Sequence, residues 1–290
     1  MSLRLLFLHA LSPLHAGTGQ STGAIELAIA RDRTTGFPCL PGTSIKGSLR
    51  GRSKDLNRAD TVALFGPESD NASDHAGAVA FGDANLLLLP VRSIAGTFAW
   101  VTSPYLLARF ARDCTEAGLT GLPSATLPTK VGDCTIALQS ALKIQQNEVI
   151  FEDLNLRATE QPSVKALAEF LGGQIFGSDT PWKASLVSRL CIVHDDVMSF
   201  LSEHATDIVA RVALKHESKT VENLWHEESL PTETVLSSLV MATPNAKTGK
   251  TPKELFLALG EITTGTIQFG GKATVGRGRC RVVLGNGGTR

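Results

Sequence analysis

Glycine and basic residues occur together in three segments of this 290-residue chain. The first is a loop with Gly17 and Gly19, the second is a helix start at residues 42–44 followed by Lys46 and Arg50, and the third lies near the C-terminus. Glycine lets backbone N–H groups approach an anion, a helix start offers free N–H groups and a positive dipole end, and Lys and Arg add charge. This combination indicates phosphate binding.

The C-terminal segment repeats the same chemistry, with Gly270-Gly271 before Lys272 and with Arg277 between two further glycines. Two loops of this kind and a basic helix suit a sugar-phosphate backbone better than one small anion. The residues expected to contact phosphate are Gly17, Gly19, Ser44, Lys46, Arg50, Gly271, Lys272 and Arg277.

His15 stands between the first apolar run and the glycine loop, eleven residues before Glu26. A single histidine at a strand end is usually structural. It becomes a candidate for proton transfer only because the neighbouring loop has the composition of an anion site.

Three common site motifs are excluded. The run Thr248-Gly249-Lys250-Thr251 ends like a P-loop, but Pro244 occupies the place of its first glycine. The loop with Gly17 and Gly19 lacks the next glycine of a dinucleotide fingerprint at the required spacing. The histidines form no H-E-x-x-H motif and no cluster with metal-ligand spacing. The sequence therefore supports neither an NTP nor an NAD site.

The formal net charge is zero, but the charge is unevenly distributed. Residues 31–58 hold seven bases and two acids, and residues 271–290 hold five bases and no acid, so each segment carries +5 and the remainder −10. Basic segments on an acidic body are compatible with an anionic partner. The alternative is two solvated basic faces that bind nothing.

The elements that must position these residues alternate irregularly, which favours an α+β fold over a doubly wound sheet. We expect strands at 3–11, 25–30, 77–90 and 147–157, helices from about 43, 104, 163 and 185 onward, and a strand, basic loop and strand over 265–284. Thr43 or Ser44 offers a hydroxyl to cap the first helix. Apolar runs at 207–216 and 234–241 flank a polar stretch and predict a long hairpin arm.

Composition limits the class of protein. The chain is long enough to bury a substantial core. Its longest apolar run, residues 86–91, contains a proline and is far shorter than the ~20 residues of a membrane span. The N-terminus does not match a signal peptide, and the five cysteines are widely spaced with no C-x-x-C pair. We therefore expect a cytoplasmic protein with no membrane partner.

Several motifs, in consistent order from near residue 5 to near residue 284, resemble the repeated backbone subunit of the type III-B (Cmr) CRISPR effector complex, a member of the RAMP superfamily. They are His15-Ala16-Gly17-Thr18-Gly19-Gln20-Ser21, Thr35-Gly36-Phe37-Pro38, Pro41-Gly42-Thr43-Ser44-Ile45-Lys46-Gly47-Ser48-Leu49-Arg50, Leu64-Phe65-Gly66, Pro90-Val91-Arg92-Ser93, Phe98-Ala99-Trp100-Val101-Thr102, Leu224-Trp225-His226-Glu227-Glu228-Ser229-Leu230-Pro231 and Gly270-Gly271-Lys272-Ala273-Thr274-Val275-Gly276-Arg277-Gly278.

The resemblance implies one RAMP domain over residues 1–290, with a ferredoxin-like, RRM-type palm, inserted segments and a β-hairpin thumb at 207–241. It implies copies stacked in a filament on one CRISPR RNA, with complementary target RNA and other Cmr subunits as partners. The family cleaves target RNA at regular intervals with a divalent metal, Mg²⁺ or Mn²⁺. The ribose 2′-OH attacks the neighbouring phosphate, so a DNA target would resist.

The resemblance also assigns roles to individual residues. His15 matches a loop histidine that orients or deprotonates the 2′-OH or protonates the leaving oxygen. Glu26 matches the loop carboxylate required for cleavage, a candidate metal ligand, and Glu227 matches a thumb glutamate. The family normally has Asp in place of Glu26 and commonly Tyr in place of Ser229.

The change from Asp to Glu leaves two hypotheses open. Glu moves the carboxylate by about one C–C bond, and a misplacement of ~1 Å can cost ~10²-fold in rate. The chain is then either a guide-binding subunit that also cleaves target RNA or an RNA-binding scaffold that does not. Without the family, the residues indicate a soluble α+β protein that binds a phosphate-rich ligand.

Overall fold

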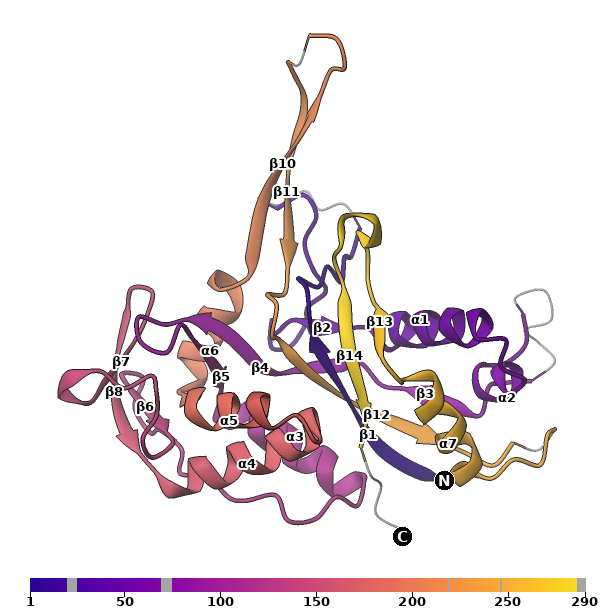
Figure 1. Ribbon diagram of the computed structural model, residues 1–290, viewed down its shortest axis with the longest axis horizontal. Helices are drawn as coiled ribbons and strands as arrows, with labels where there is room; N and C mark the ends of the chain where they lie inside the picture. The colour runs from indigo at the N-terminus through magenta and orange to yellow at the C-terminus, as the bar shows by residue number, and fades with distance from the viewer. Residues whose placement is uncertain (20–24, 69–74, 219, 246, 286–290) are drawn as a thin grey trace.

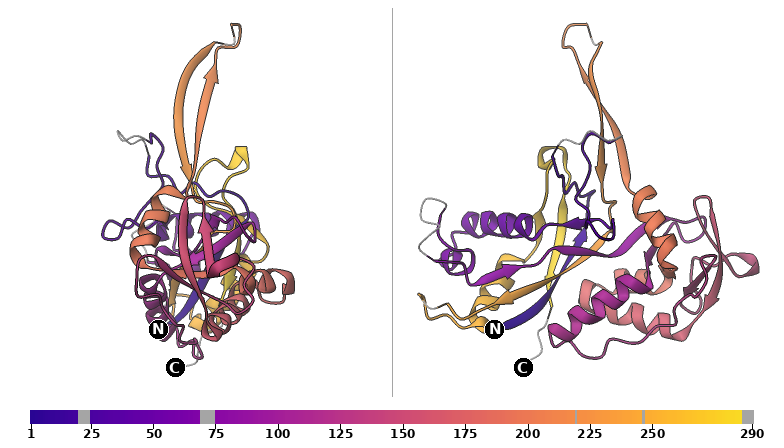
Figure 2. Two further views of the ribbon diagram at one scale, coloured as in Figure 1. Left: turned by 90° about the vertical axis from the view of Figure 1, so that its left-hand side faces the viewer. Right: turned by 180° about the vertical axis from the view of Figure 1, so that it is seen from behind.

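The computed structural model describes residues 1–19, 25–68, 75–218, 220–245 and 247–285. These residues form an elongated body, and one long β-hairpin stands out from its middle (Figures 1 and 2). Within these ranges, each helix is too short or too polar to cross a lipid bilayer.

A twelve-stranded mixed sheet runs through the body. Its order is β13-β14-β1-β12-β4-β5-β9-β6-β8-β7, with β2 beside β4 and β3 beside β12, and a separate two-stranded sheet pairs β10 with β11. The strands are β1 Ser2–Ala10, β2 Cys39–Leu40, β3 Val79–Phe81, β4 Ala84–Arg92, β5 Phe98–Thr102, β6 Asp133–Ile136, β7 Glu148–Phe151, β8 Leu154–Glu160, β9 Leu190–Val193, β10 Asp207–Leu214, β11 Val221–Ser229, β12 Val235–Ala242, β13 Thr266–Gln268 and β14 Arg279–Leu284.

The helices divide between the two ends of the body. On the right in Figure 1 lie α1, α2 and α7, and on the left lie α3, α4, α5 and α6. Their bounds are α1 Gly42–Asp55, α2 Thr61–Phe65, α3 Pro104–Glu116, α4 Pro162–Phe176, α5 Thr180–Arg189, α6 Asp195–His204 and α7 Pro252–Ile262, with short 3₁₀ turns at Gln145–Asn147 and Ala273–Val275.

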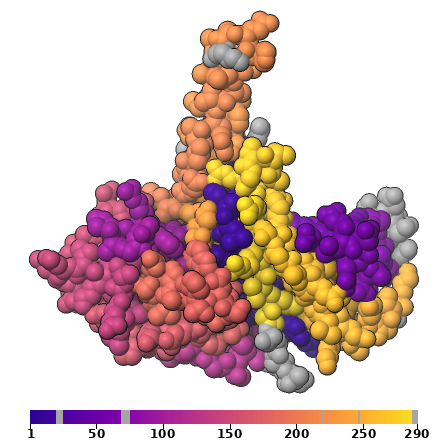
Figure 3. Space-filling model, viewed as in Figure 1, coloured from indigo at the N-terminus to yellow at the C-terminus, as the bar shows by residue number. Residues whose placement is uncertain are grey.

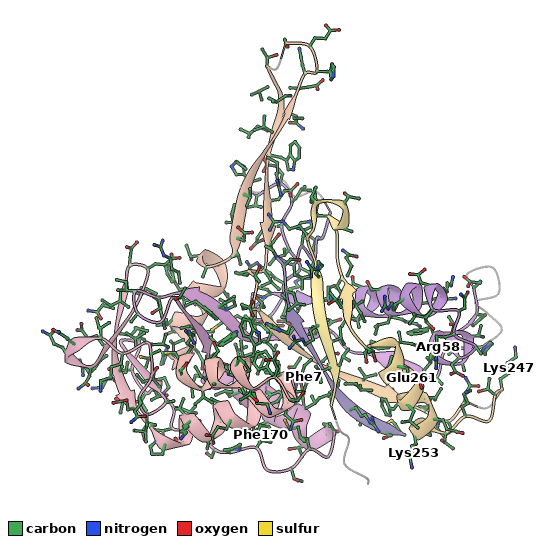
Figure 4. All side chains as sticks on the ribbon, in the orientation of Figure 1. Phe7, Arg58, Phe170, Lys247, Lys253 and Glu261 are labelled. Atoms are coloured by element: carbon green, nitrogen blue, oxygen red, sulfur yellow. The ribbon has the colours of Figure 1, made fainter. Side chains whose placement is uncertain are left out.

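Strand β1 is apolar on both faces because helices cover both faces of the sheet. Leu6 and Leu8 belong to the core that contains residues of α1 and α7, whereas Leu5 and Phe7 belong to the core that contains residues of α3, α4 and α5. Phe7, near the centre of Figure 4, lies with its ring 6.0 Å from that of Phe110 in α3. A strand buried on both faces reads as a continuous apolar run, which explains the weak alternation of its sequence.

Several predicted elements are confirmed. Strand β1 and the C-terminal pair β13 and β14 lie where the sequence predicts them. Helix α3 begins after Ser103, whose side-chain oxygen accepts a hydrogen bond from the Leu106 N–H at 3.5 Å. Helix α4 begins one residue before the predicted start.

Other predictions are wrong in detail. The single strand expected at 77–90 is two strands, β3 and β4, and the strand expected at 147–157 is the hairpin of β7 and β8. The helix expected from residue 185 onward is α5, which begins at Thr180 and ends at Arg189. In the two predicted strands a short break or a turn lies inside the run, where periodicity gives little warning.

The projecting arm is a hairpin of β10 and β11, so the predicted second limb at 234–241 is wrong. That run forms β12, which pairs with β1 in the body and is almost entirely buried. The first half of β11, in contrast, is exposed. A projecting hairpin is solvated on both faces, so its second strand is the polar segment and not the apolar run that follows it.

Candidate functional site

Strand β11 binds the loop of residues 25–31 along one edge at the base of the hairpin. The Leu27 N–H donates to the His226 carbonyl at 3.1 Å, and the Glu228 N–H donates to the Leu27 carbonyl at 3.0 Å. These bonds form a short parallel bridge, and Ile29 forms a second bridge with Gly17. The strand predicted at 25–30 is therefore wrong, because the segment makes only isolated bridges.

Carboxylates replace backbone carbonyls at both ends of this short ladder. In a continued parallel ladder, the His226 N–H would donate to the carbonyl of residue 25, and the Ile29 N–H to the carbonyl of Glu228. Instead, Glu26 Oε2 accepts from the His226 N–H at 2.8 Å, and Glu228 Oε2 accepts from the Ile29 N–H at 3.1 Å. The two acids therefore determine where the loop meets the strand and where it leaves.

The Glu26 carboxylate is accessible, with 45% of its side chain exposed. Its Oε2 also lies 3.4 Å from His226 Nδ1. The backbone hydrogen bond from His226 is the main cause that lowers the pKa of Glu26, so the carboxylate is ionised at neutral pH. No hydrogen bond joins Glu26 Oε1 to another residue in the described part of the chain.

The His15 imidazole is buried, with 6% of the residue exposed. Its Nδ1 lies 2.7 Å from the Glu228 carbonyl. A carbonyl oxygen only accepts, so Nδ1 carries the hydrogen and Nε2 is the acceptor of the neutral ring. A Cβ on Gly17 would lie 2.5 Å from Nε2, and one on Gly271 would lie 3.3 Å from Cδ2. Packing against His15 therefore requires a glycine at position 17 and leaves little room for a side chain at position 271.

The Glu227 carboxylate is buried, with 5% of the residue exposed, and is fully engaged. Oε1 accepts from Trp225 Nε1–H at 2.8 Å and from Lys272 Nζ at 2.7 Å, and Oε2 lies 3.4 Å from Arg211 Nε. Burial alone would raise the pKa of Glu227, but the hydrogen bonds from Lys272 and Trp225 outweigh it and lower the pKa. This acid joins both strands of the hairpin to the C-terminal glycine loop.

The three predicted catalytic residues meet on one stretch of β11, but not on one face of it. Side chains alternate along a strand, so Trp225 and Glu227 share one face, and His226 and Glu228 share the other. Glu26 contacts His226 and His15 contacts the Glu228 carbonyl. Glu227 therefore points away from the side chain that lies against Glu26.

Sequence reasoning missed the ion pair between the buried Glu228 and the half-buried Arg31. Arg31 donates to Glu228 Oε1 at 2.5 Å, and also to the carbonyls of Gly36 and Ser202 at 2.9 and 3.0 Å. This pair attaches the loop to α6 as well as to β11. The only signal in the sequence was the Glu227-Glu228 doublet, since alternation puts one member of such a pair on each face of a strand.

The start of α1 is partly occupied by the chain itself. Asp83 Oδ1 accepts from the Gly42 N–H at 2.7 Å and so caps the helix from a distant part of the chain, and the prediction of a Thr43 or Ser44 cap is wrong. Lys46 and Arg50 line a cavity of 710 Å³ beside α2 and β3. Arg50 also donates to the Pro67 carbonyl at 2.6 Å.

Most cations of the two basic segments form ion pairs within the chain. The pairs are Arg31 with Glu228, Arg50 and Lys54 with Glu68, Arg58 with Asp60 and Glu261, Lys272 with Glu227, Arg277 with Asp207 and Arg281 with Asp179. Figure 4 shows Arg58 and Glu261 side by side, between α1 and α7. The charge imbalance of the sequence is therefore largely neutralised internally.

The hydroxyl of Thr251, at the end of the P-loop-like run, has a structural role. Its side chain accepts from the Glu254 N–H, and the Glu254 carboxylate accepts from the Thr251 N–H, which is the capping box of α7. The capping box accounts for Thr251 at this position, so no nucleotide site is needed to explain it.

Glu26 is the accessible carboxylate that the described part of the site offers to a metal. Among the described residues, no group of three or more His, Cys, Asp or Glu side chains is arranged to bind one. Mg²⁺ commonly takes one or two carboxylates together with waters and substrate phosphates. Glu26, with Oε1 available, suits that shared arrangement, whereas Glu227 would first have to release Lys272.

The protruding hairpin, the loop bound to its base and the glycine-rich C-terminal loop define a nucleic-acid-binding type of palm and thumb. Figure 3 shows the indigo N-terminal segment exposed between the orange hairpin base and the yellow C-terminal segment. The family model of the RAMP superfamily matches residues 7–281, and the chain belongs to this superfamily.

Within the superfamily, the chain is 36% identical to the CRISPR system Cmr endoribonuclease Cmr4 of Pyrococcus furiosus, over 100% of this chain and 99% of that protein. The crystal structure of oligomeric Cmr4 from P. furiosus superposes with a TM-score of 0.78 at 29% identity, covering 100% of both chains. A chain of the type III-B Cmr-beta complex bound to cognate target RNA matches with a TM-score of 0.75 at 20% identity, over 98% and 97% of the two chains. The predicted α+β RAMP fold and the resemblance to the Cmr backbone subunit are confirmed.

Proposed function

We propose that the chain is an RNA-binding backbone subunit of a type III-B Cmr complex and that it cleaves target RNA. One observation carries the proposal: Glu26 and His15 are hydrogen-bonded to one short stretch of β11 at the base of the hairpin, Glu26 to the His226 N–H and His15 to the Glu228 carbonyl. The relative of this chain from P. furiosus is named an endoribonuclease, which supports cleavage of RNA here. A structural neighbour was solved in a complex bound to target RNA, which supports RNA as the partner.

The guide RNA would run past the start of α1 and the C-terminal glycine loop. Lys46 forms no ion pair with a described residue, so it is available to a phosphate without exchange. Lys272 and Arg277 are held by Glu227 and Asp207, so RNA must compete with these carboxylates for them. Binding through such residues depends on salt because phosphate contacts release counterions.

In the cleavage reaction, the ribose 2′-oxygen forms a bond to the adjacent phosphorus while the bond from phosphorus to the 5′-oxygen breaks. The 2′-OH loses a proton and the leaving 5′-oxygen gains one, so the products are a 2′,3′-cyclic phosphate and a 5′-hydroxyl. Only RNA carries this nucleophile.

Glu26 suits a charge-based role in this step. Its lowered pKa makes it a weak base, but an ionised, half-exposed carboxylate can orient the 2′-OH or hold a cation near the phosphate. A divalent metal, Mg²⁺ or Mn²⁺, held by Glu26 and the RNA would neutralise charge on the phosphate. His15 is buried and holds the Glu228 carbonyl, which suits positioning of the loop better than proton transfer.

The alternative is a scaffold that binds RNA without cleaving it. The specific observation behind it is that Glu227 is closed off by Lys272, Trp225 and Arg211, so this acid is not available to RNA in the present arrangement. In either case the partners are CRISPR RNA, target RNA, further copies of this chain and other Cmr subunits in the cytoplasm.

The test uses the assembled complex with guide RNA and end-labelled complementary RNA on a denaturing gel. Native protein, Glu26→Ala and Glu26→Asp are compared with and without a chelator. We expect regularly spaced cuts that require the metal and disappear in Glu26→Ala. Target binding without cuts by the native protein, together with cuts by Glu26→Asp, would establish the scaffold.

A further inference from the structure

Glu26 and His226 interact although they lie 200 residues apart in the sequence. The backbone of Leu27 pairs with β11 through the His226 carbonyl and the Glu228 N–H. The His226 N–H points to the same side of the strand, but no backbone carbonyl of the described loop accepts from it. Glu26 Oε2 takes that N–H at 2.8 Å. The side chain thus extends the ladder by one bond beyond the point where the backbone leaves it.

The imidazole of the same residue adds a second contact to the same oxygen. His226 Nδ1 lies 3.4 Å from Glu26 Oε2, and 42% of the histidine side chain is exposed beside the carboxylate. One contact fixes the position of Oε2, and the second restricts rotation of the carboxylate about its terminal bond. Oε1 forms no hydrogen bond to another described residue.

We infer that His226 is a positioning residue for Glu26: its backbone N–H and imidazole hold one carboxylate oxygen so that the other is presented to the RNA. The inference deepens the proposed function and rests on it. It supplies a physical reason why a Glu can serve at this position. The additional methylene adds a torsion, and two contacts at one oxygen remove the freedom that the torsion introduces.

A shorter acid would not make the same contacts. Asp at position 26 would withdraw the carboxylate by about one C–C bond, beyond reach of an N–H that is now at 2.8 Å. The length of the side chain and the presence of His226 are therefore coupled. Coupling of this kind is measured by a double-mutant cycle.

The first experiment measures single-turnover cleavage and target-RNA affinity separately in the assembled complex. His226→Ala should lower the cleavage rate about 10-fold and leave target affinity unchanged, because positioning acts on the reacting group. His226→Asn should restore most of the rate, since its amide nitrogen can occupy the place of Nδ1. In a Glu26→Asp background, His226→Ala should have little further effect. The matched control is His204→Ala in α6, whose Nδ1 bonds to the Phe200 carbonyl and not to Glu26.

The second experiment does not depend on cleavage. In the isolated full chain, Glu26→Ala should shift the NMR signals of the His226 amide and of its imidazole Nδ1, while those of His204 stay unchanged. Glu217→Ala near the hairpin tip is the matched acid control and should shift neither. The inference is wrong if native protein and His226→Ala cleave at the same rate. It is also wrong if the His226 NMR signals do not shift in Glu26→Ala. If the signals shift and native protein does not cleave, the positioning contact stands and only the proposed cleavage fails.

Discussion

Lys272 Nζ lies 2.7 Å from Glu227 Oε1 and so joins the C-terminal glycine loop to the base of the hairpin. The lysine is 31% exposed and the glutamate 7% in their side chains, which makes this a half-buried ion pair. Lys272 adopts a left-handed backbone conformation, with φ of 65°, that non-glycine residues rarely take. The two segments carry residues of the proposed RNA-binding surface, and this pair fixes one segment against the other.

Lys272→Met should destabilise the protein. Removing one partner leaves Glu227 buried, but Arg211 and Trp225 remain, so we expect a loss of about 2 kcal/mol and not the ~3–5 kcal/mol of a fully orphaned charge. Chemical denaturation measures this change. Lys46→Met is the control, because Lys46 has no described ion-pair partner and its replacement should affect RNA binding without affecting stability. Equal stability of the two variants would contradict the role of the pair.

Acid should weaken the same interaction. Burial acts to raise the pKa of Glu227 in the folded protein, but the hydrogen bonds from Lys272 and Trp225 to the carboxylate outweigh burial. The pKa of Glu227 is therefore lowered. The folded state therefore binds the proton less readily than the unfolded state. The stabilisation is complete above the unfolded pKa of about 4.3 and is lost as the pH falls through the lower folded value. The difference in thermal stability between native protein and Glu227→Gln should be constant above the unfolded pKa of about 4.3 and should shrink as the pH falls below it, and a difference that does not change with pH would refute the assignment.

Gly17→Ala should disturb His15. The new methyl group would lie 2.5 Å from His15 Nε2, and the ring cannot easily retreat because Nδ1 is bound to the Glu228 carbonyl. We expect a cost of about 1–3 kcal/mol from overpacking and a loss of cleavage. Gly47→Ala in α1 is the control: no atom lies within 4 Å of its Cβ, and the change should stabilise the helix by about 0.5–1 kcal/mol. Thermal unfolding of both variants distinguishes the two sites.

Charge reversal on α1 should weaken guide-RNA binding. Lys46→Glu together with Arg50→Glu should lower affinity at least 10-fold and reduce the salt dependence, with the log-log slope falling by ~0.7–0.9 for each phosphate that is no longer neutralised. Fluorescence anisotropy over a salt series measures both. Lys253→Glu on α7, an exposed lysine outside the basic segments, is the control and should change neither value. Unchanged affinity in the double variant would argue against α1 as part of the interface.

The reach of sequence-based prediction is clear from particular elements. Strand β1 and helix α3 were predictable because their signals are local: an apolar run bounded by Pro13, and Ser103 followed by Pro104 at a helix start. The second strand of the hairpin was not, because polarity along 221–229 resembles a loop until its partner β10 is known. The cap of α1 was missed for a similar reason, since Asp83 lies 41 residues away in the chain.

By itself, the sequence determined the residue types of the site and their family, because motifs such as the one around His15 and the run Leu224–Pro231 specify local chemistry wherever they fold. Only the tertiary structure decided which groups are available. Hydrogen bonds between distant segments leave Glu26 half exposed against His226 and close Glu227 behind Lys272 and Arg211. The reason is physical: the availability of a charge depends on burial and on partners brought together by folding, and neither is encoded in the spacing of residues along the chain.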